Sequence, residues 1–375
     1  MIFFLWEILS VKGGVKMENY CINTRILSGH GALGALGEMG IRQLLVVADP
    51  FFVKNGKAAE VAALAGAEKT EFYTRIVPDP DLNTVAEGVA LAREFGPDTV
   101  VALGGGSAMD CAKAVCYFSG LAPQLIAVPT TSGSGSEVTD FAVLTHGGVK
   151  HPLVDPQLRP VAAILDAGLL EQLPPALVAD AGFDAISHAL EAYVAKNAGA
   201  ITDALAEKAF CIGISQLPAS FRGDVRVREE LHLASCMAGM AFSQAGLGLC
   251  HAMSHGLGGQ FHVPHGRLNA ILLPAVLGCN SAAAGKYAKL ARLAGLGGSA
   301  EAVAVRNLKN ALVGLRQQLN LPGTLAQAGI QPQELWQKLP ELREAVLADP
   351  CCETNPVPVD EKMVRRVLEE VAGNA

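Results

Sequence analysis

The chain of 375 residues is predicted to fold as an α/β N-terminal part, a parallel sheet flanked by helices, followed by an all-helical C-terminal part. Short apolar runs alternate with helical patterns up to residue 165. This alternation is typical of a parallel sheet whose ligands bind at the carboxyl ends of its strands. From about residue 172, alanine- and leucine-rich helical patterns dominate and no further strand is indicated. We therefore expect an extension over residues 1–16, an α/β domain over 17–172 and a helical domain over 173–375.

The composition suits a compact enzyme. Half of the residues are hydrophobic and 17% are charged, and the length allows two domains with a large core. The net charge of −7 argues against nucleic acid or an anionic membrane as the main partner. The nine cysteines lack Cys-x-x-Cys spacing and are expected to be buried thiols in a reducing compartment. The first apolar run, residues 1–6, is too short for a membrane span. We expect a cytoplasmic protein in which Met17 could be the true start and residues 1–16 have no catalytic role.

Each element follows from a local pattern. Buried strands are expected at four apolar runs, 44–48, 99–103, 125–128 and 161–165. An alanine-rich helix is expected at about 55–66. The capping-box pattern Thr84-x-x-Glu87 predicts the start of another helix, which is expected to end near Gly96. In the C-terminal part, helical patterns cover 184–195, 200–217, 225–245, 249–258, 268–279, 282–295, 300–319 and 359–372.

The strand at 99–103 runs directly into Gly104-Gly105-Gly106-Ser107, and a helix follows. Glycines let the backbone approach an anion closely, and a helix N-terminus offers free N–H groups. This pattern favours a phosphate site, although a merely tight turn is the alternative and the spacing is not Gly-x-Gly-x-x-Gly. Ser107 with Asp110 three residues later also fits a helix N-cap and its partner.

A second loop, residues 130–136, follows the neighbouring strand and is rich in glycine and in hydroxyl side chains. Its hydroxyl-bearing candidates are Thr130, Thr131, Ser132 and Ser134. Two such loops at one sheet edge favour a dinucleotide site. Asp49 closes the first strand, where it could accept a hydrogen bond from a ribose hydroxyl and repel a 2′-phosphate. A turn aspartate before Pro50 is the competing interpretation.

The helical part contains a candidate metal site. Asp184 and His188 are four residues apart, which places them on one helix face. His251 can reach the same point from a second helix, and His265 can approach from a loop. One carboxylate and three imidazoles suit Fe²⁺ or Zn²⁺. The alternative is a set of core histidines with satisfied hydrogen bonds, but clustering in an apolar neighbourhood favours a shared cation.

From about residue 20 to its end, the sequence resembles the iron-containing (group III) alcohol dehydrogenases. Four motifs carry the resemblance in matching order and spacing: Gly-Gly-Gly-Ser-x-x-Asp-x-x-Lys at 104–113, Pro-Thr-Thr-Ser-Gly-Ser-Gly-Ser-Glu-Val-Thr at 129–139, Gly-Phe-Asp-Ala-Ile-Ser-His-Ala-Leu-Glu-Ala-Tyr at 182–193 and His-x-x-x-His-x(9)-His-Gly at 251–266. The resemblance implies a dehydroquinate synthase-like architecture, with a nucleotide domain, a helical metal-binding domain and an active site between them.

The resemblance also implies roles for particular residues. Asp184, His188, His251 and His265 would ligate the metal. His255 would lie near the nicotinamide and assist proton transfer. Gly104, Gly105, Gly106 and Ser107 would hold the pyrophosphate of NAD(H), and Thr130, Thr131, Ser132 and Ser134 would line the cofactor cleft. Lys150 would contact the cofactor, and Asp49 would favour NAD over NADP. His262 matches no family role and is expected at the surface or the cleft rim.

The expected reaction is the interconversion of a short-chain primary alcohol, such as ethanol or 1-propanol, and its aldehyde with NAD(H). The full ligand set favours iron, with zinc as the alternative. A homodimer or larger homo-oligomer is expected from the family. A glycerol- or polyol-type dehydrogenase is the nearest alternative. A sugar-phosphate carbocycle synthase would need basic residues near the metal, where only Arg267 is available. A nucleotide-binding protein with a structural metal is the non-enzymatic alternative.

Overall fold

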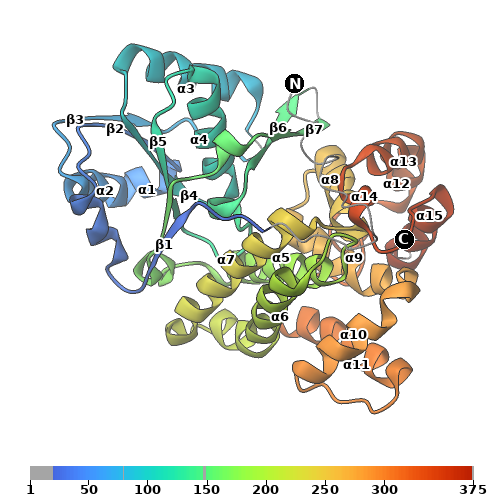
Figure 1. Cartoon of the computed structure of the whole chain (residues 1–375). Helices are drawn as coiled ribbons and strands as arrows, with labels where there is room; N and C mark the ends of the chain where they lie inside the picture. Colours follow the sequence, from blue (N-terminus) through green and yellow to red (C-terminus); the bar gives the residue numbers. More distant parts are fainter. Residues whose placement is uncertain (1–19, 79, 147–148, 374–375) are drawn as a thin grey trace, which may run out of the picture.

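The computed structural model describes residues 20–78, 80–146 and 149–373. The expectation for residues 1–16 therefore lies outside the described residues. A six-stranded parallel sheet in the order β1-β8-β5-β4-β2-β3 forms one part of the molecule, and a large group of helices forms the other (Figure 1). The sheet strands are β1 (Arg25–Ser28), β2 (Gln43–Ala48), β3 (Lys69–Tyr73), β4 (Thr99–Gly104), β5 (Gln124–Pro129) and β8 (Ala162–Leu165).

The four predicted strands correspond to β2, β4, β5 and β8. Their apolar runs are buried on both faces, as parallel strands covered by helices require. The edge strands β1 and β3 were not expected, because they are partly exposed and lack a continuous apolar run. An antiparallel hairpin of β6 (Phe141–His146) and β7 (Val149–Val154) was not expected either. It projects from the α/β part towards α8 (Leu249–Phe261) (Figure 1).

Helices cover both faces of the sheet. Successive strand residues point to opposite faces, so Leu45 and Val47 pack with α3 and α4, whereas Leu44 and Val46 pack with α2. The helices of this part are α1 (Pro50–Lys54), α2 (Lys57–Ala65), α3 (Leu82–Phe95) and α4 (Gly106–Ser119).

The helix expected at about 55–66 is confirmed as α2, while the short helix α1 before it was not expected. One helix start in this part differs from the prediction. The helix assigned to a capping box at Thr84 begins earlier, because Asp81 is its N-cap and accepts a hydrogen bond from the Thr84 N–H at 2.8 Å. The predicted end is correct, since Gly96 closes α3 in the left-handed conformation that favours glycine.

The C-terminal part is helical and holds the largest core cluster of the described residues. Its long helix α5 packs against α6, α7 and α9. The principal helices are α5 (Pro175–Val194), α6 (Ala200–Phe221), α7 (Arg228–Ala245), α8 (Leu249–Phe261), α9 (His265–Cys279), α10 (Ala284–Leu293), α11 (Glu301–Gln318), α12 (Pro332–Gln337), α13 (Leu339–Ala348), α14 (Cys351–Thr354) and α15 (Glu361–Val371).

Helix α5 starts at Pro175, nine residues before the predicted position 184. Its first turns contain Pro175 and Gly182, the two residue types with the lowest helix propensity, which hid this part of the helix in the sequence. The short helices α12 to α14 were not expected, because four to ten residues give too little periodicity. No single helix in the described residues is long and apolar enough to cross a membrane. Two sharply bent helix pairs reach that length and composition only when taken together. All nine cysteines are free thiols.

Candidate active site

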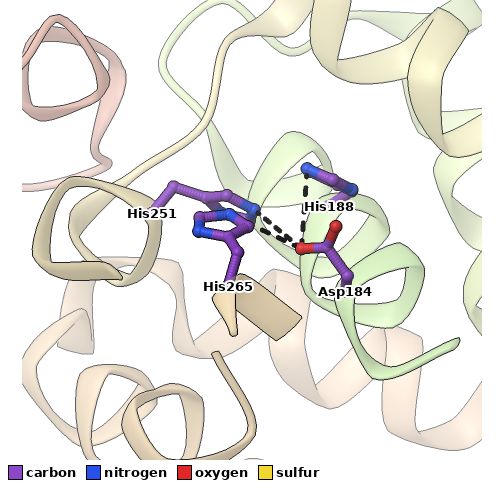
Figure 2. Close-up of side chains that lie close together, drawn as sticks. All are labelled: Asp184, His188, His251 and His265. Carbon is purple, nitrogen blue, oxygen red and sulfur yellow. Dashed lines mark ion pairs between the residues drawn. The ribbon is translucent and has the colours of Figure 1, made fainter. Parts of the chain in front are cut away.

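Four side chains from three helices converge on one point (Figure 2). Asp184 and His188 extend from α5, His251 from the first turn of α8 and His265 from the first residue of α9. The Asp184 Oδ1 atom lies 3.9 Å from His188 Nε2, 3.8 Å from His251 Nε2 and 3.6 Å from His265 Nε2. His265 therefore comes from a helix start rather than from the loop that the sequence suggested.

Local sequence explains this convergence. The four-residue spacing stacks Asp184 and His188 on one face of α5. Pro264 is the N-cap residue of α9, which begins at His265; proline is tolerated at a helix start because the N–H that it lacks would have no partner within the helix. Gly266 then lets α9 approach α5 closely, because a Cβ atom at this position would overlap the Asp180 carbonyl oxygen.

The donor geometry fits a divalent metal ion. Ligand atoms about 2.1 Å from a tetrahedral ion would lie about 3.4 Å from one another, close to the observed 3.6–3.9 Å. The set of one carboxylate and three imidazoles suits Fe²⁺ or Zn²⁺. Burial adds to this argument, since the His188 and His251 side chains are only 7% and 1% exposed.

The electrostatics of the cluster are consistent with cation binding. Burial lowers the pKa of His188 to about 4 and the pKa of His265 well below its ordinary value. Both imidazoles are therefore neutral at neutral pH, the form that ligates metals. Burial also opposes the charge on His251, but the nearby Asp184 carboxylate and the Glu191 carboxylate hydrogen-bonded to Nδ1 outweigh it and raise the pKa of His251 to about 9. In the absence of a cation, His251 would thus carry a proton between two carboxylates.

Two buried residues that the sequence analysis missed support the cluster. Glu191 accepts a hydrogen bond from His251 Nδ1 at 2.7 Å. Asn269 donates from Nδ2 to Asp184 Oδ1 at 2.7 Å, and its own Oδ1 accepts from the Ser254 hydroxyl. The signal for Glu191 was present, because it follows Asp184 by seven residues and so lies on the same helix face.

His255 borders the cluster without joining it. Its ring stacks on His265 with centroids 5.1 Å apart, and its Nδ1 atom is 2.8 Å from Asp349 Oδ2. The sequence analysis missed Asp349, which lies between α13 and α14. His262 is exposed at the C-terminal end of α8 and has a left-handed backbone, so its expected surface position is confirmed.

The first glycine loop has one glycine that the backbone requires. Gly104 has a φ of 156°, and a Cβ atom there would lie 2.5 Å from the Ala108 Cβ. Gly105 and Gly106 have ordinary φ values, and added Cβ atoms would come no closer than 3.4 Å to the described neighbours. Neither backbone conformation nor packing explains the last two glycines, whereas the close approach of a ligand would.

The helix cap predicted after this loop is wrong. Gly105, not Ser107, is the N-cap of α4, and it makes no side-chain cap. Asp110 is not a capping partner, because it accepts hydrogen bonds from Ser136 Oγ at 3.0 Å and Val143 N at 3.2 Å. Asp110 instead connects α4 to Ser136 at the end of the second loop and to Val143 on β6.

The second loop lies between the sheet and the helical part. The Thr130 N–H donates to the Gly104 carbonyl oxygen at 3.0 Å, which ties the two loops together. His188 Nδ1 lies 3.2 Å from the Gly133 carbonyl oxygen, which ties the loop to the donor cluster. Ser132 Oγ lies 3.1 Å from Nδ1 of His232 on α7. The Ser132 hydroxyl therefore already has a protein partner.

The two other predicted cofactor residues lie in different places, Asp49 directly after β2 and Lys150 on β7. Asp49 N-caps α1 by accepting from the Phe51 N–H at 2.8 Å, so the competing structural role is confirmed for one carboxylate oxygen. Asp49 also lies beside Gly104, because a Cβ atom added there would be 3.4 Å from the Asp49 Cβ. Lys150 extends from β7 towards α8, where a Cβ atom added at Gly258 would be 3.8 Å from its Nζ.

A buried polar network joins α4 to the end of the second loop. Lys113 is fully buried, and its ammonium group donates to Ser136 Oγ, Thr139 Oγ1 and the Phe141 carbonyl oxygen at 2.8–3.0 Å. Glu137 is also buried. Burial lowers the pKa of Lys113 to about 8 and raises the pKa of Glu137 to about 7.

Glu137→Gln is expected to remove a pH-dependent loss of stability. A pKa of about 7 in the folded protein, against 4.5 ordinarily, means that the folded state binds more protons between these values. Stability then falls as pH rises from about 4.5 to 7. In urea unfolding, the gain from Glu137→Gln should be about 2 kcal/mol larger at pH 8 than at pH 5. The exposed control Glu344→Gln should show no such difference; equal gains at both pH values would contradict the prediction.

Comparisons with known proteins give a consistent result. Residues 23–167 match the family described as iron-containing alcohol dehydrogenase, and residues 178–372 match the C-terminal part of the Fe-containing alcohol dehydrogenase family. The chain is 40% identical to the 1-propanol dehydrogenase PduQ of Citrobacter freundii, over 95% of this chain and 100% of that protein. It is 36% identical to the NADPH-dependent butanol dehydrogenase of Clostridium saccharobutylicum, over 94% and 97%. The solved sulfoacetaldehyde reductase of Bifidobacterium kashiwanohense in complex with NAD⁺ superposes with a TM-score of 0.86 at 26% identity, over 96% and 100%.

Proposed function

The chain belongs to the iron-containing alcohol dehydrogenase family, and from this premise we propose that it interconverts a short-chain primary alcohol and its aldehyde with NAD(H). The proposed metal ligands are Asp184, His188, His251 and His265. The observation that carries the proposal is the position of His188. Its Nε2 atom faces the donor cluster while its Nδ1 atom contacts Gly133 of the second loop. A metal and a dinucleotide would therefore meet at one site.

Residues of the chain would bind the cofactor and exchange the proton, while the bound groups would supply the rest of the chemistry. A bound Fe²⁺ or Zn²⁺ would supply a Lewis acid for the substrate oxygen, and the nicotinamide would exchange the hydride. Glycines 104 to 106 would admit the pyrophosphate to the start of α4. His255 would exchange the proton, because Asp349 holds its Nδ1 atom and leaves Nε2 free for the reacting oxygen or a water molecule.

The similar proteins support a short aliphatic substrate such as 1-propanol or ethanol, since they are named for 1-propanol and butanol. The synthase alternative requires a cation for a substrate phosphate. Arg267, the candidate for that role, makes two hydrogen bonds to Asp180 at 2.9 and 3.2 Å. We therefore favour the dehydrogenase. We also infer a cytoplasmic homodimer or larger homo-oligomer without nucleic-acid or membrane partners.

The preference for NAD is proposed to depend on the negative charge of Asp49, and Asp49→Asn tests this. Asparagine also N-caps helices well, so the hydrogen bond from Phe51 N should persist while the charge is lost. We expect the ratio of kcat/KM for NADH to that for NADPH to fall roughly 10- to 100-fold, about 1.4–3 kcal/mol. Lys54→Gln, an exposed change on the same helix, serves as the control. An unchanged ratio in Asp49→Asn would assign Asp49 to capping alone.

The function itself is tested with metal-stripped protein reloaded with Fe²⁺ or Zn²⁺. NADH oxidation is followed with acetaldehyde, propionaldehyde or dihydroxyacetone. We expect metal-dependent turnover that is fastest with the short aldehydes, and a preference for dihydroxyacetone would favour the polyol alternative. Stoichiometric metal without turnover of any alcohol or aldehyde, with either NADH or NADPH, would overturn the dehydrogenase assignment.

A further inference from the structure

We infer that Glu191 is the positioning residue that presents His251 to the metal through Nε2, and that it couples this orientation to the start of α8. The inference rests on the proposed metal site and deepens it. Glu191 lies on α5, 2% exposed, and belongs to neither the donor cluster nor the nucleotide loops.

The Glu191 carboxylate accepts hydrogen bonds from four N–H groups. Its Oε2 atom accepts from His251 Nδ1 at 2.7 Å, from Gly248 N at 3.0 Å and from the His251 backbone N–H at 3.3 Å. Its Oε1 atom accepts from Cys250 N at 2.8 Å. These backbone groups form the first turn of α8 and have no acceptor within the helix. One carboxylate therefore stabilises the helix start and one imidazole of the cluster together.

The contact decides which ring nitrogen faces the metal. An ionised carboxylate can only accept hydrogen bonds, so Nδ1 of His251 must carry the hydrogen. With a metal ion in place of the second ring proton, the Nε2 lone pair would face the ion on the side of Asp184 Oδ1, which is 3.8 Å away. A carboxylate partner also raises the basicity of a ligating imidazole, and loss of such partners typically weakens metal affinity 10- to 100-fold.

His251 depends on this support more than His188 does. The Nδ1 atom of His188 contacts a neutral carbonyl group, that of Gly133, whereas the partner of His251 is charged and its hydrogen bond is stronger. The surroundings are also tight. A Cβ atom added at Gly248 would lie 2.8 Å from Glu191 Oε1 and 2.8 Å from Asn355 Oδ1. The carboxylate therefore has little room to move away from the ring.

Glu191→Gln separates shape from hydrogen bonding. In either orientation of the amide, its NH₂ group faces N–H donors, those of His251 and Gly248 or that of Cys250. When the NH₂ group faces the ring, it favours the tautomer with hydrogen on Nε2, which cannot ligate a metal through that atom. We expect the full-length metal-free variant to bind Zn²⁺ 10- to 100-fold more weakly in competition with a chromophoric chelator. The absorption spectrum of its Co²⁺ form should change as well.

Asn355→Ala is the matched control. Asn355 Oδ1 accepts from the Leu249 N–H at 3.1 Å, so it caps the same helix start without contacting the His251 ring. This variant should lower the urea midpoint yet keep the dissociation constant for Zn²⁺ within about threefold of the unsubstituted protein. Glu191→Asp, which keeps an acceptor one methylene farther away, should weaken Zn²⁺ binding roughly threefold to tenfold and provides the measurement if Glu191→Gln does not fold.

The outcomes are distinct. Unchanged Zn²⁺ affinity in the folded Glu191 variants would overturn the inference while leaving the proposed metal site intact. Equal weakening by Asn355→Ala would also overturn it, because the effect would then come from the helix start. Failure of the unsubstituted protein to bind Zn²⁺, Co²⁺ or Fe²⁺ would overturn the proposed metal site, and this inference with it.

Discussion

His265→Ala should abolish aldehyde-dependent NADH oxidation and release the bound metal. The substitution removes one of the four donors, and its Nε2 atom is the closest of the three imidazole atoms to Asp184 Oδ1, at 3.6 Å. Without the proposed ion, the substrate oxygen would lose its Lewis acid. We expect kcat/KM to fall at least about 1,000-fold, or about 4 kcal/mol. Steady-state assays and metal analysis of the purified variant measure the two effects.

The control for this variant is His262→Ala, three residues earlier. His262 is exposed at the end of α8 and lies outside the donor cluster. This variant should keep its metal content and its activity within about threefold. A His265→Ala protein that retained both full metal content and full turnover would remove His265 from the proposed ligand set.

Gly266→Ala should damage the fold and the site together. An added methyl group would overlap the Asp180 carbonyl oxygen and lie 3.1 Å from the Asp184 Cβ. Helices α5 and α9 would have to move apart, separating His265 from Asp184. Overpacking between two backbones that cannot yield costs about 3 kcal/mol or more. Urea unfolding and metal content are the measurements, and both should decrease.

Gly278→Ala on the same helix is the matched control. No heavy atom in the described residues lies within 4 Å of a Cβ atom added at Gly278, and alanine is favoured over glycine in a helix by about 0.5–1 kcal/mol. This variant should be as stable as the unsubstituted protein or slightly more stable. Loss of stability in Gly278→Ala equal to that in Gly266→Ala would show that general helix effects, rather than the α5–α9 contact, decide the result.

The sequence could indicate the donor cluster because spacing along a helix and side-chain chemistry are both local properties. Asp184 and His188 could be predicted to lie together from their four-residue separation on one helix alone. Asn269 and Asp349 could not be assigned in the same way, because their roles depend on how separate helices pack. Ser107 and Asp110 matched a local capping pattern, but tertiary contacts to Ser136 and Val143 prevailed for Asp110.

The secondary-structure elements that could be predicted are likewise those that depend on local sequence rather than on contacts with distant residues. The buried strands β2, β4, β5 and β8 are continuous apolar runs and could be predicted. The edge strands β1 and β3 could not, since half-exposed strands carry polar residues and depend on pairing with a neighbour. The first turns of α5 were missed for a local reason, because Pro175 and Gly182 have the lowest helix propensities.

The hydrogen bond between His188 Nδ1 and the Gly133 carbonyl oxygen has a thermodynamic consequence. The imidazole belongs to the donor cluster, while the carbonyl group belongs to the second loop, so ordering one restrains the other. Each proposed ligand would then reduce the conformational freedom that the second ligand must overcome. By linkage, the factor by which metal raises dinucleotide affinity equals the factor by which dinucleotide raises metal affinity.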